Sequence, residues 1–400
     1  MFEGKFEGNR KVAVKRVIAQ FWSKVDNEQA LFLKTDDHEN VLRYFTTERC
    51  SRYCYIALEF CEGTLEQFID KDHPKHFVNP HVNGLEILSD ALHGIDYLHS
   101  LNKPIVHRDV KPSNVLIYIP NGASRNPRGK IADLGLSKQL EQHRETFTTS
   151  TNRGSKGWMA PEVLKKPAQK DDKGKITATL KVDIFCSGML LYYVKSNGKH
   201  LFGGEHDDED IRNYNIKWGI YDFKHLDKLK DGIYINLIEK MIASEPNNRP
   251  SMKACLSHPV FWKNERILEF FRVASDYLKE AADVPLNVKT AIERKNAVFT
   301  TTEWISQMDP IIQKDVRENK HAKYNGQRVE HILQAIRDYS HHFNKKSAEV
   351  RGTLISLDKG LVDYFLDKFP TLLTHTFKSL EPCKSNVGLS PFYDTDFLFA

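Results

Sequence analysis

Hydrophobic and polar residues alternate through much of the first sixty positions, which is typical of β-strands with one buried face. The runs Val12–Lys15 and Tyr55–Cys61 both show this alternation. From Leu65 to about Trp262 the spacing of hydrophobic residues becomes helical, with loops between the helices. We therefore expect a β-rich segment over residues 1–58 and a larger, mainly helical segment over residues 59–262.

A third segment, residues 263–393, is predicted to be helical throughout, with a short tail at 394–400. Between positions 328 and 337, hydrophobic residues recur at the i, i+3, i+4, i+7 spacing of a packed helix face: Val329, Ile332, Leu333 and Ile336. Residues 321–346 contain five Lys or Arg against two acidic residues, a local charge of +3, together with four histidines. The pattern predicts a packed helix in a basic, histidine-rich stretch.

Composition limits the classes of protein that fit. A chain of 400 residues that is 40% hydrophobic is long enough for two or three domains with buried cores. Its 58 basic and 53 acidic residues leave a net charge of +5, so the overall charge does not indicate a nucleic-acid partner. The six cysteines lack paired metal-ligand spacing and fit reduced thiols in a cytosolic setting. There is no run of eighteen apolar residues, so we expect no direct membrane contact.

The strongest chemical signal is the segment 107–114, His-Arg-Asp-Val-Lys-Pro-Ser-Asn, followed by Asp133-Leu-Gly. These are the catalytic loop and the metal-binding Asp of a protein kinase. Phosphoryl transfer needs a carboxylate to accept the hydroxyl proton and a cation near the transferred phosphate, the roles predicted for Asp109 and Lys111. It also needs oxygen ligands for Mg²⁺, the role predicted for Asn114 and Asp133.

Residues upstream complete a nucleotide site. Lys15, at the end of a predicted strand, is expected to contact the phosphates of ATP or ADP, with Glu28 as its ion-pair partner. The backbones of Glu59 and Cys61 are expected to hydrogen-bond the adenine, with Leu58 closing the pocket behind it. The sequence therefore predicts a bilobal, α+β protein kinase fold.

The segment after Asp133 carries several hydroxyl side chains. Ala160-Pro161-Glu162 ends this activation segment, and we expect Arg249 to pair with Glu162. Ser155 is expected to contact Asp109. A phosphate on the segment would pair with Arg108, and the candidate acceptors are Thr146, Thr148 and Ser150.

A glycine-rich loop, which covers the phosphates in kinases, is not evident ahead of Lys15. The segment 2–8 resembles the strand that follows such a loop, so the chain is expected to begin inside the small lobe. Without that cover phosphoryl transfer is expected to be poor, while nucleotide binding persists through the hinge, Lys15 and Mg²⁺.

The basic stretch with its histidines and Tyr324 has the groups for metal-independent RNA cleavage. One group takes the proton of the ribose 2′-hydroxyl, another protonates the leaving oxygen, and cations stabilise the phosphorane. Charge pattern alone favours the other interpretation, a solvated helix face.

Other motifs of the last segment favour the first alternative. Nearly the whole chain resembles the inositol-requiring enzyme family, the serine/threonine-protein kinase/endoribonucleases of the unfolded-protein response, with ribonuclease L as a more distant relative. The resemblance implies a kinase fold followed by an all-α ribonuclease module, and in that module it is carried by Trp304, 323–326, 336–342, 369–370 and 373–376.

By position in that family, Tyr324 is expected to be the general base, His342 the general acid, and Arg337 the group that holds the scissile phosphate. The family has asparagine at the next position, where this chain has Asp338. A neutral amide can donate a hydrogen bond to phosphate, whereas a carboxylate repels it unless protonated.

The resemblance also implies a mechanism of control. Nucleotide binding and autophosphorylation would favour a homodimer or higher oligomer that cleaves RNA stem-loops. Family members are endoplasmic reticulum membrane proteins with these domains in the cytosol, so this chain is expected to be cytoplasmic. Two alternatives stay open: a catalytically weakened signalling scaffold, and a plain serine/threonine kinase with a docking tail.

Overall fold

A computed structural model describes most of the chain. The described residues are 1–18, 31, 35, 38–73, 75–120, 126–140, 146–149, 154–164, 176–204, 208–280, 284–319, 323–355 and 360–393. They divide into two compact units. The first contains Met1–Leu226 and Leu237–Leu256, and the second contains Asp227–Asn236 and the described residues from Ser257 onward.

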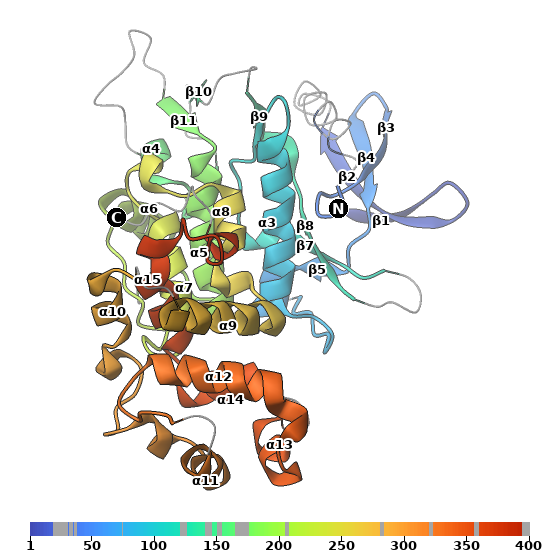
Figure 1. Cartoon of the computed structure of the whole chain (residues 1–400). Coiled ribbons are helices and arrows are strands. Elements are labelled where there is room, and N and C mark those ends of the chain that lie inside the picture. The colour runs from blue at the N-terminus through green and yellow to red at the C-terminus, as the bar shows by residue number, and fades with distance from the viewer. Residues whose placement is uncertain are drawn as a thin grey trace. The chain divides into compact units, whose positions relative to one another are not determined.

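The first unit opens with a four-stranded antiparallel sheet whose strand order is β1-β2-β4-β3 (Figure 1). The turn between the first two strands places Glu7, Gly8 and Asn9 at positive φ, and its only glycine is the residue best suited to that region. The sheet confirms the strands predicted from alternation. Its strands are β1 (Phe2–Phe6), β2 (Arg10–Ile18), β3 (Tyr44–Arg49) and β4 (Tyr53–Glu59).

Helices, a small three-stranded sheet and short strand pairs make up the rest of the first unit. Helix α5 is buried on nearly every side, which explains why its sequence is apolar all round. The short strands are β5 (Gly63–Thr64), β6 (Ile105–Val106), β7 (Val115–Tyr118), β8 (Arg128–Ile131), β9 (Lys138–Gln139), β10 (Thr146–Thr149) and β11 (Ile176–Thr179). The helices here are α2 (Leu65–Ile69), α3 (Gly84–Ser100), α4 (Pro161–Leu164), α5 (Lys181–Lys195), α6 (Glu209–Trp218) and α8 (Met252–Ser257), and α7 (Gly232–Met241) has residues in both units.

Asp183, in the first turn of α5, fixes the loop that follows β6. Its side chain is fully buried and accepts hydrogen bonds from the backbone N–H groups of His107 and Arg108, each at 2.8 Å. His99 Nε2 of α3 lies 2.8 Å from the same carboxylate. Burial favours the neutral acid, but these contacts hold the pKa of Asp183 below its usual value. A buried anion therefore fixes the backbone of the predicted catalytic loop through these hydrogen bonds.

The expected pair between Arg249 and Glu162 is confirmed. The Arg249 guanidinium is 1% exposed and binds both carboxylate oxygens of Glu162, at 2.7 and 2.8 Å. Such a two-point contact fixes orientation as well as charge. The pair ties the end of the activation segment to the helical part of the unit.

The second unit contains only helices and turns among its described residues. Helix α12 packs along α9, and its hydrophobic face (Val329, Ile332, Leu333 and Ile336) is fully buried, as the spacing predicted (Figure 1). The helices are α9 (Asn264–Glu280), α10 (Leu286–Ile292), α11 (Pro310–Glu318), α12 (Glu330–His342), α13 (Ala348–Leu354), α14 (Leu361–Lys368) and α15 (Leu372–Leu380).

An aromatic cluster forms part of the core of this unit. The ring of Trp262 lies edge-on to Phe270 and Phe377, with centroids 5.3 and 5.8 Å apart, and Phe392 contacts the same group. Edge-to-face packing of this kind adds to the free energy gained from burial. The cluster joins the start of the unit to its last helices.

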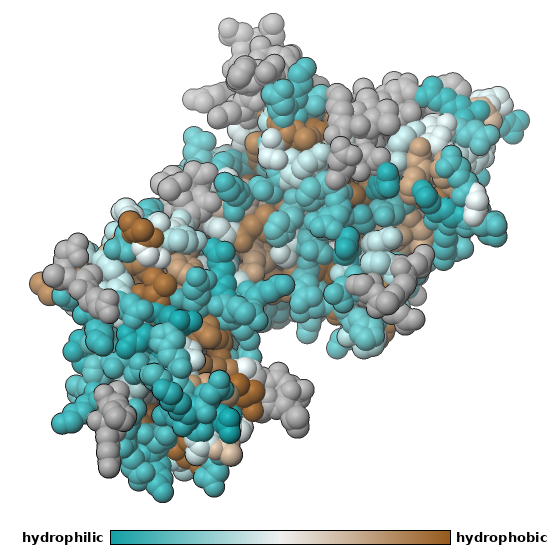
Figure 2. Space-filling view, turned by 45° about the vertical axis from the view of Figure 1, so that its right-hand side comes forward, coloured by the Kyte–Doolittle hydropathy of each residue, from teal (hydrophilic) through white to brown (hydrophobic). Residues whose placement is uncertain are grey.

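Figure 2 shows a mainly hydrophilic surface on the side that it presents, interrupted by small hydrophobic patches. Among the described residues, no helix combines the length and the apolar character needed to cross a bilayer.

We predict that Asp183→Ala lowers the free energy of unfolding of the first unit by about 2–5 kcal/mol, because it leaves two buried N–H donors without their acceptor. Urea denaturation followed by far-UV circular dichroism measures the change. Asp72→Ala, at an exposed position of the same unit, should stay within about 0.5 kcal/mol of the unsubstituted chain. Equal stability of the two variants would contradict the anchoring role of Asp183.

Candidate active sites

The first candidate site is built around Asp109, which the loop after β6 presents. One carboxylate oxygen lies 3.1 Å from Lys111 Nζ and accepts a hydrogen bond from Asn114 Nδ2 at 2.9 Å. The other accepts from the Ser155 hydroxyl at 2.8 Å, which confirms the contact expected between these residues. The amide nitrogen of Asn114 is therefore directed to Asp109, which leaves its oxygen as the atom suited to a cation.

Lys15 on β2 reaches Asp133, with Nζ 2.9 Å from Oδ1. Asp133 lies at φ +67°, where its carboxylate accepts from the N–H of Gly135. Burial favours the neutral acid, but the Lys15 ammonium holds the pKa of Asp133 below its usual value. The expected partner of Lys15, Glu28, lies outside the described residues, so the Lys15–Asp133 pair is a contact that the motifs did not predict.

The side chains of Asp133 and Asn114 suit a magnesium nucleotide. Mg²⁺ prefers oxygen ligands, and the Asp133 carboxylate and the Asn114 amide oxygen are of that kind. Lys15 adds a cation for the phosphates. The donor set therefore fits the group that the kinase motifs imply.

The predicted hinge lies at the end of β4. Leu58 is buried, as expected for a residue that closes a pocket, and the Glu59 carboxylate lies 3.0 Å from Lys130 Nζ. The N–H of Glu59 donates to the carbonyl of Arg43 at 2.9 Å, so this donor is already engaged. Burial, with the nearby charge of Glu59, raises the pKa of the Cys61 thiol well above its usual value, so the thiol stays protonated.

The predicted phosphorylation sites fall where side chains are not described. Strand β10 contains Thr146 and Thr148, of which only the backbone is described, and Ser150 lies outside the described residues. The guanidinium of Arg108, expected to bind a phosphate, instead donates to the carbonyl of Leu136. A phosphate on the segment would have to compete with that carbonyl.

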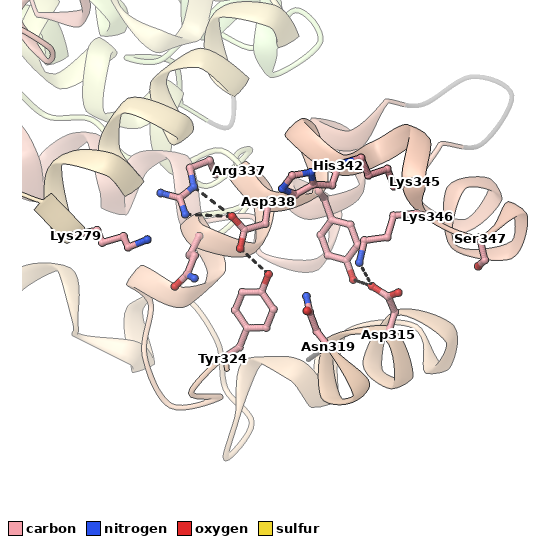
Figure 3. Close-up of a pocket in the computed structure, with 12 residues that line it drawn as sticks. Lys279, Asp315, Asn319, Tyr324, Arg337, Asp338, His342, Lys345, Lys346 and Ser347 are labelled. Carbon is pink, nitrogen blue, oxygen red and sulfur yellow. Dashed lines mark hydrogen bonds and ion pairs between the residues drawn. The ribbon is translucent and has the colours of Figure 1, made fainter. Parts of the chain in front are cut away.

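The second candidate site is a pocket of about 630 Å³ within the second unit (Figure 3). All three residues predicted for RNA cleavage line it: Tyr324, Arg337 and His342. Four cationic side chains and two carboxylates line the same pocket, a balance of +2 with histidine neutral. These six are Lys279, Arg337, Lys345, Lys346, Asp315 and Asp338.

Trp304 positions Tyr324 from the core of the unit. The indole is fully buried, its Nε1–H donates to the carbonyl of Asn325 at 3.2 Å, and its ring lies edge-on to Tyr324 with centroids 6.1 Å apart. The backbone N–H of Trp304 also donates to the carbonyl of Gly326. The turn that carries Tyr324 is therefore held on a rigid base.

The hydroxyl of Tyr324 donates to Asp338 Oδ2 at 2.8 Å (Figure 3). Burial, and then the negative charge of Asp338, raise the pKa of Tyr324 far above its usual value. Tyr324 is therefore a neutral phenol at physiological pH. The expected effect of Asp338, repulsion of phosphate, is only part of its role, because this carboxylate also binds the predicted general base.

Arg337 lies between two carboxylates. Nη1 is 2.5 Å from Asp276 on α9. Nη2 is 3.1 Å from Asp338 on its own helix, a contact that Figure 3 shows. Sequence reasoning missed the contact of Asp276 with Arg337, because nothing in the local pattern of α9 indicates a partner that lies 61 positions later in the chain. The charge of this guanidinium is thus already partly balanced before any phosphate binds.

Helix α12 brings His342 close to Asp338, since residues four apart share a helix face. His342 is exposed to solvent and lines the pocket. A second tyrosine–carboxylate contact lies in the same pocket, where the Tyr339 hydroxyl donates to Asp315 at 2.7 Å. Asp315 also pairs with Lys346 at 2.6 Å, and sequence reasoning assigned no role to either residue.

Two family descriptions match the chain. Residues 3–261 match the Protein kinase domain, and residues 267–393 match Ribonuclease 2-5A. The second match covers every residue of the pocket that sequence reasoning singled out.

Named relatives match over nearly the whole chain. A human protein named Serine/threonine-protein kinase/endoribonuclease IRE2 is 36% identical over 99% of the chain and 41% of its own length. The Caenorhabditis elegans protein named Serine/threonine-protein kinase/endoribonuclease ire-1 is 32% identical over 99% of the chain and 39% of its own length. The Schizosaccharomyces pombe protein named Sensor for unfolded proteins in the ER ire1 is 32% identical over 94% of the chain and 36% of its own length. The chain spans about two-fifths of these curated relatives.

We predict that Trp304→Ala lowers the free energy of unfolding of the second unit by about 3–5 kcal/mol, the usual cost of removing a large buried aromatic side chain. Trp304→Phe keeps a ring against Tyr324 and should cost clearly less. Denaturant titration of both variants, monitored by circular dichroism, provides the comparison. Equal losses in the two variants would contradict a contribution of the aromatic ring itself to the support of the Tyr324 turn.

Proposed function

Because this chain belongs to the inositol-requiring family of serine/threonine-protein kinase/endoribonucleases, we propose that it binds a magnesium nucleotide in its first unit and cleaves RNA in its second. The proposed RNA substrate is a stem-loop, cut without a metal ion. The kinase lobes would occupy residues 1–58 and 59–262, and the ribonuclease module residues 263–393, with a tail at 394–400.

The observation that carries the ribonuclease proposal is the meeting of Tyr324, Arg337 and His342 in one cationic pocket. Tyr324 is assigned to the ribose 2′-hydroxyl, His342 to the leaving 5′-oxygen, and Arg337 to the phosphate between them. The exposed position of His342 suits a group that must regain a proton from water after each cleavage. The net positive lining attracts the RNA backbone.

In the first unit, Asp109 is assigned to the hydroxyl proton of the phosphoryl acceptor and Lys111 to the transferred phosphate. Asn114 and Asp133 would hold Mg²⁺, which supplies charge neutralisation at the phosphates. Lys15 would exchange its contact with Asp133 for the phosphates, and the backbone of the hinge at Glu59 and Cys61 would bind adenine.

The proposal extends to control of the cleavage. Nucleotide binding and autophosphorylation at Thr146, Thr148 or Ser150 would favour a homodimer or higher oligomer with a competent ribonuclease. The relative named as a sensor for unfolded proteins in the ER supports a role in the unfolded-protein response. From the family resemblance, these units would lie on the cytosolic side of the endoplasmic reticulum membrane.

We predict that His342→Ala lowers cleavage of a short RNA hairpin by about a hundredfold or more, the usual effect of removing a general acid. The assay uses purified chain with and without magnesium nucleotide, and follows the labelled product on a gel. Cleavage by the unsubstituted chain should rise with nucleotide and with protein concentration.

His341→Ala is the matched control. His341 is equally exposed and adjacent in sequence, but it does not line the pocket. Its loss should leave cleavage within about twofold of the unsubstituted chain. Equal activity of both histidine variants, or no cleavage by a folded, nucleotide-bound chain, would refute the ribonuclease proposal and favour the signalling scaffold.

We further predict that Asp133→Ala weakens binding of Mg²⁺–ADP by about tenfold or more but leaves binding of metal-free ADP unchanged, since the carboxylate serves the metal. Isothermal titration calorimetry with and without EDTA separates the two. Asp72→Ala is the exposed control. A parallel loss in both titrations would show that Asp133 acts on the fold of the site rather than on the metal.

A further inference from the structure

The hydrogen bond between Tyr324 and Asp338 disfavours the phenolate, the form of Tyr324 that could act as a base without help from another group. The hydroxyl is part-buried and donates its proton to a carboxylate 2.8 Å away. Both burial and that carboxylate disfavour the phenolate, as the raised pKa of Tyr324 reflects. A neutral phenol accepts a proton only if it can pass its own proton on. Among the described residues, the carboxylate of Asp338 is the group that accepts the hydrogen bond of this hydroxyl.

We propose that Asp338 is the proton acceptor for RNA cleavage, receiving through Tyr324 the proton of the ribose 2′-hydroxyl. This inference rests on the proposed ribonuclease function and deepens it, since the base becomes a tyrosine–carboxylate pair. Asp338 acts through Tyr324, so its role is to position and accept a proton rather than to contact the RNA. The asparagine expected from the family could hold the same hydrogen bond but could not take the proton.

The step balances within the pocket. The 2′-O–H bond breaks as its proton passes to Tyr324 Oη, while the Tyr324 O–H bond breaks and a new O–H bond forms on Asp338. The 2′-oxygen bonds to phosphorus, and the bond from phosphorus to the 5′-oxygen breaks as protonated His342 gives that oxygen a proton. The products are a 2′,3′-cyclic phosphate and a 5′-hydroxyl. Asp338 then returns its proton to water and His342 regains one.

The neighbouring cation and the phenol contact different oxygens of Asp338. Arg337 Nη2 lies 3.1 Å from its Oδ1, the oxygen that Tyr324 does not use. Asp276 shares that guanidinium, and Asp315 and Lys346 form a separate pair nearby. Lys279 of α9 and His342 of α12 line the same pocket. One oxygen of Asp338 is thus held by a cation while the other faces the phenol.

The second tyrosine–carboxylate contact of the pocket does not suit this role. Tyr339 is 2% exposed, so RNA cannot reach its hydroxyl. Its acceptor oxygen on Asp315 is the same one that Lys346 binds, at 2.6 Å. Tyr324 is more accessible, and its acceptor oxygen makes no ion pair among the contacts of the described residues. Of these two pairs, the Tyr324 pair therefore has a hydroxyl that RNA can approach and a carboxylate oxygen that is not bound to a cation.

The test compares Asp338→Asn with the unsubstituted chain in steady-state cleavage of the RNA hairpin. We expect kcat to fall about a hundredfold while KM stays level or falls, because a negative charge near the phosphate has been removed.

Asp309→Asn is the matched control. Asp309 accepts a hydrogen bond from the hydroxyl of Tyr364 at 2.9 Å and pairs with Lys368, but none of these residues lines the pocket. The substitution therefore makes the same chemical change in a tyrosine–carboxylate pair that is not expected to meet RNA. Both kcat and KM for hairpin cleavage should be unchanged in this control.

A second readout does not depend on cleavage. A fluorotyrosine placed at position 324 reports ionisation of that hydroxyl by ¹⁹F NMR. Its titration should move to lower pH in the Asp338→Asn background and stay in place in the Asp309→Asn background. An unmoved titration would show that Asp338 does not hold the proton of Tyr324 and would overturn the proposal.

The outcomes separate the two proposals. Cleavage that needs His342 but has an equal or higher kcat in Asp338→Asn leaves the ribonuclease proposal standing and overturns the role of Asp338 as acceptor. Cleavage by the unsubstituted chain that is absent or indifferent to His342→Ala removes the ribonuclease function, and the inference with it. A lower kcat without a higher KM, together with a shifted fluorotyrosine titration, supports Asp338 as the proton acceptor.

Discussion

The buried carboxylate of Asp183 sets the geometry on which the first site depends. Two consecutive backbone N–H groups of the catalytic loop donate hydrogen bonds to its oxygens, at 2.8 Å each. One of them belongs to Arg108, whose φ of +67° is unfavourable for a residue with a side chain. A buried anion with charge-assisted hydrogen bonds can hold such a backbone, because breaking these bonds would leave the carboxylate and the N–H groups buried without a partner. The position of Asp109 follows from this anchor.

Carboxylates also position the side chains of the second site, but there they are more exposed to solvent than Asp183. The side chain of Asp276 is 47% exposed, so water screens its contact with Arg337 and the pair is worth little in isolation. An RNA phosphate can therefore replace Asp276 on the guanidinium without a large penalty. The first site is rigid because its anchor is buried, whereas the second can exchange partners because its ion pairs are accessible.

Sequence patterns predicted the fold and the composition of both sites, but not their internal contacts. Alternation and helical spacing identified the strands β2 and β4 and the buried face of α12, because those patterns follow from burial alone. Arg249 with Glu162 and Ser155 with Asp109 were foreseen, since a kinase motif fixes both partners. The clamp of Arg337 by Asp276 was not, because an ion pair between two helices leaves no local trace. Nor was the contact of Lys15 with Asp133, since the motif suggests Glu28 as the partner.

The change from amide to carboxylate at position 338 acts in two opposing directions. A negative charge beside Arg337 weakens the attraction of the pocket for phosphate, and the accessible geometry limits this loss. In the part of the chain that the structure describes, the same carboxylate accepts the hydrogen bond of a phenol that burial keeps neutral. Binding and proton transfer thus make opposite demands on one side chain. Since only interactions that strengthen in the transition state accelerate a reaction, weaker binding of the ground state is compatible with faster chemistry. Asp338 is therefore better understood as part of the base than as a defect in a phosphate site.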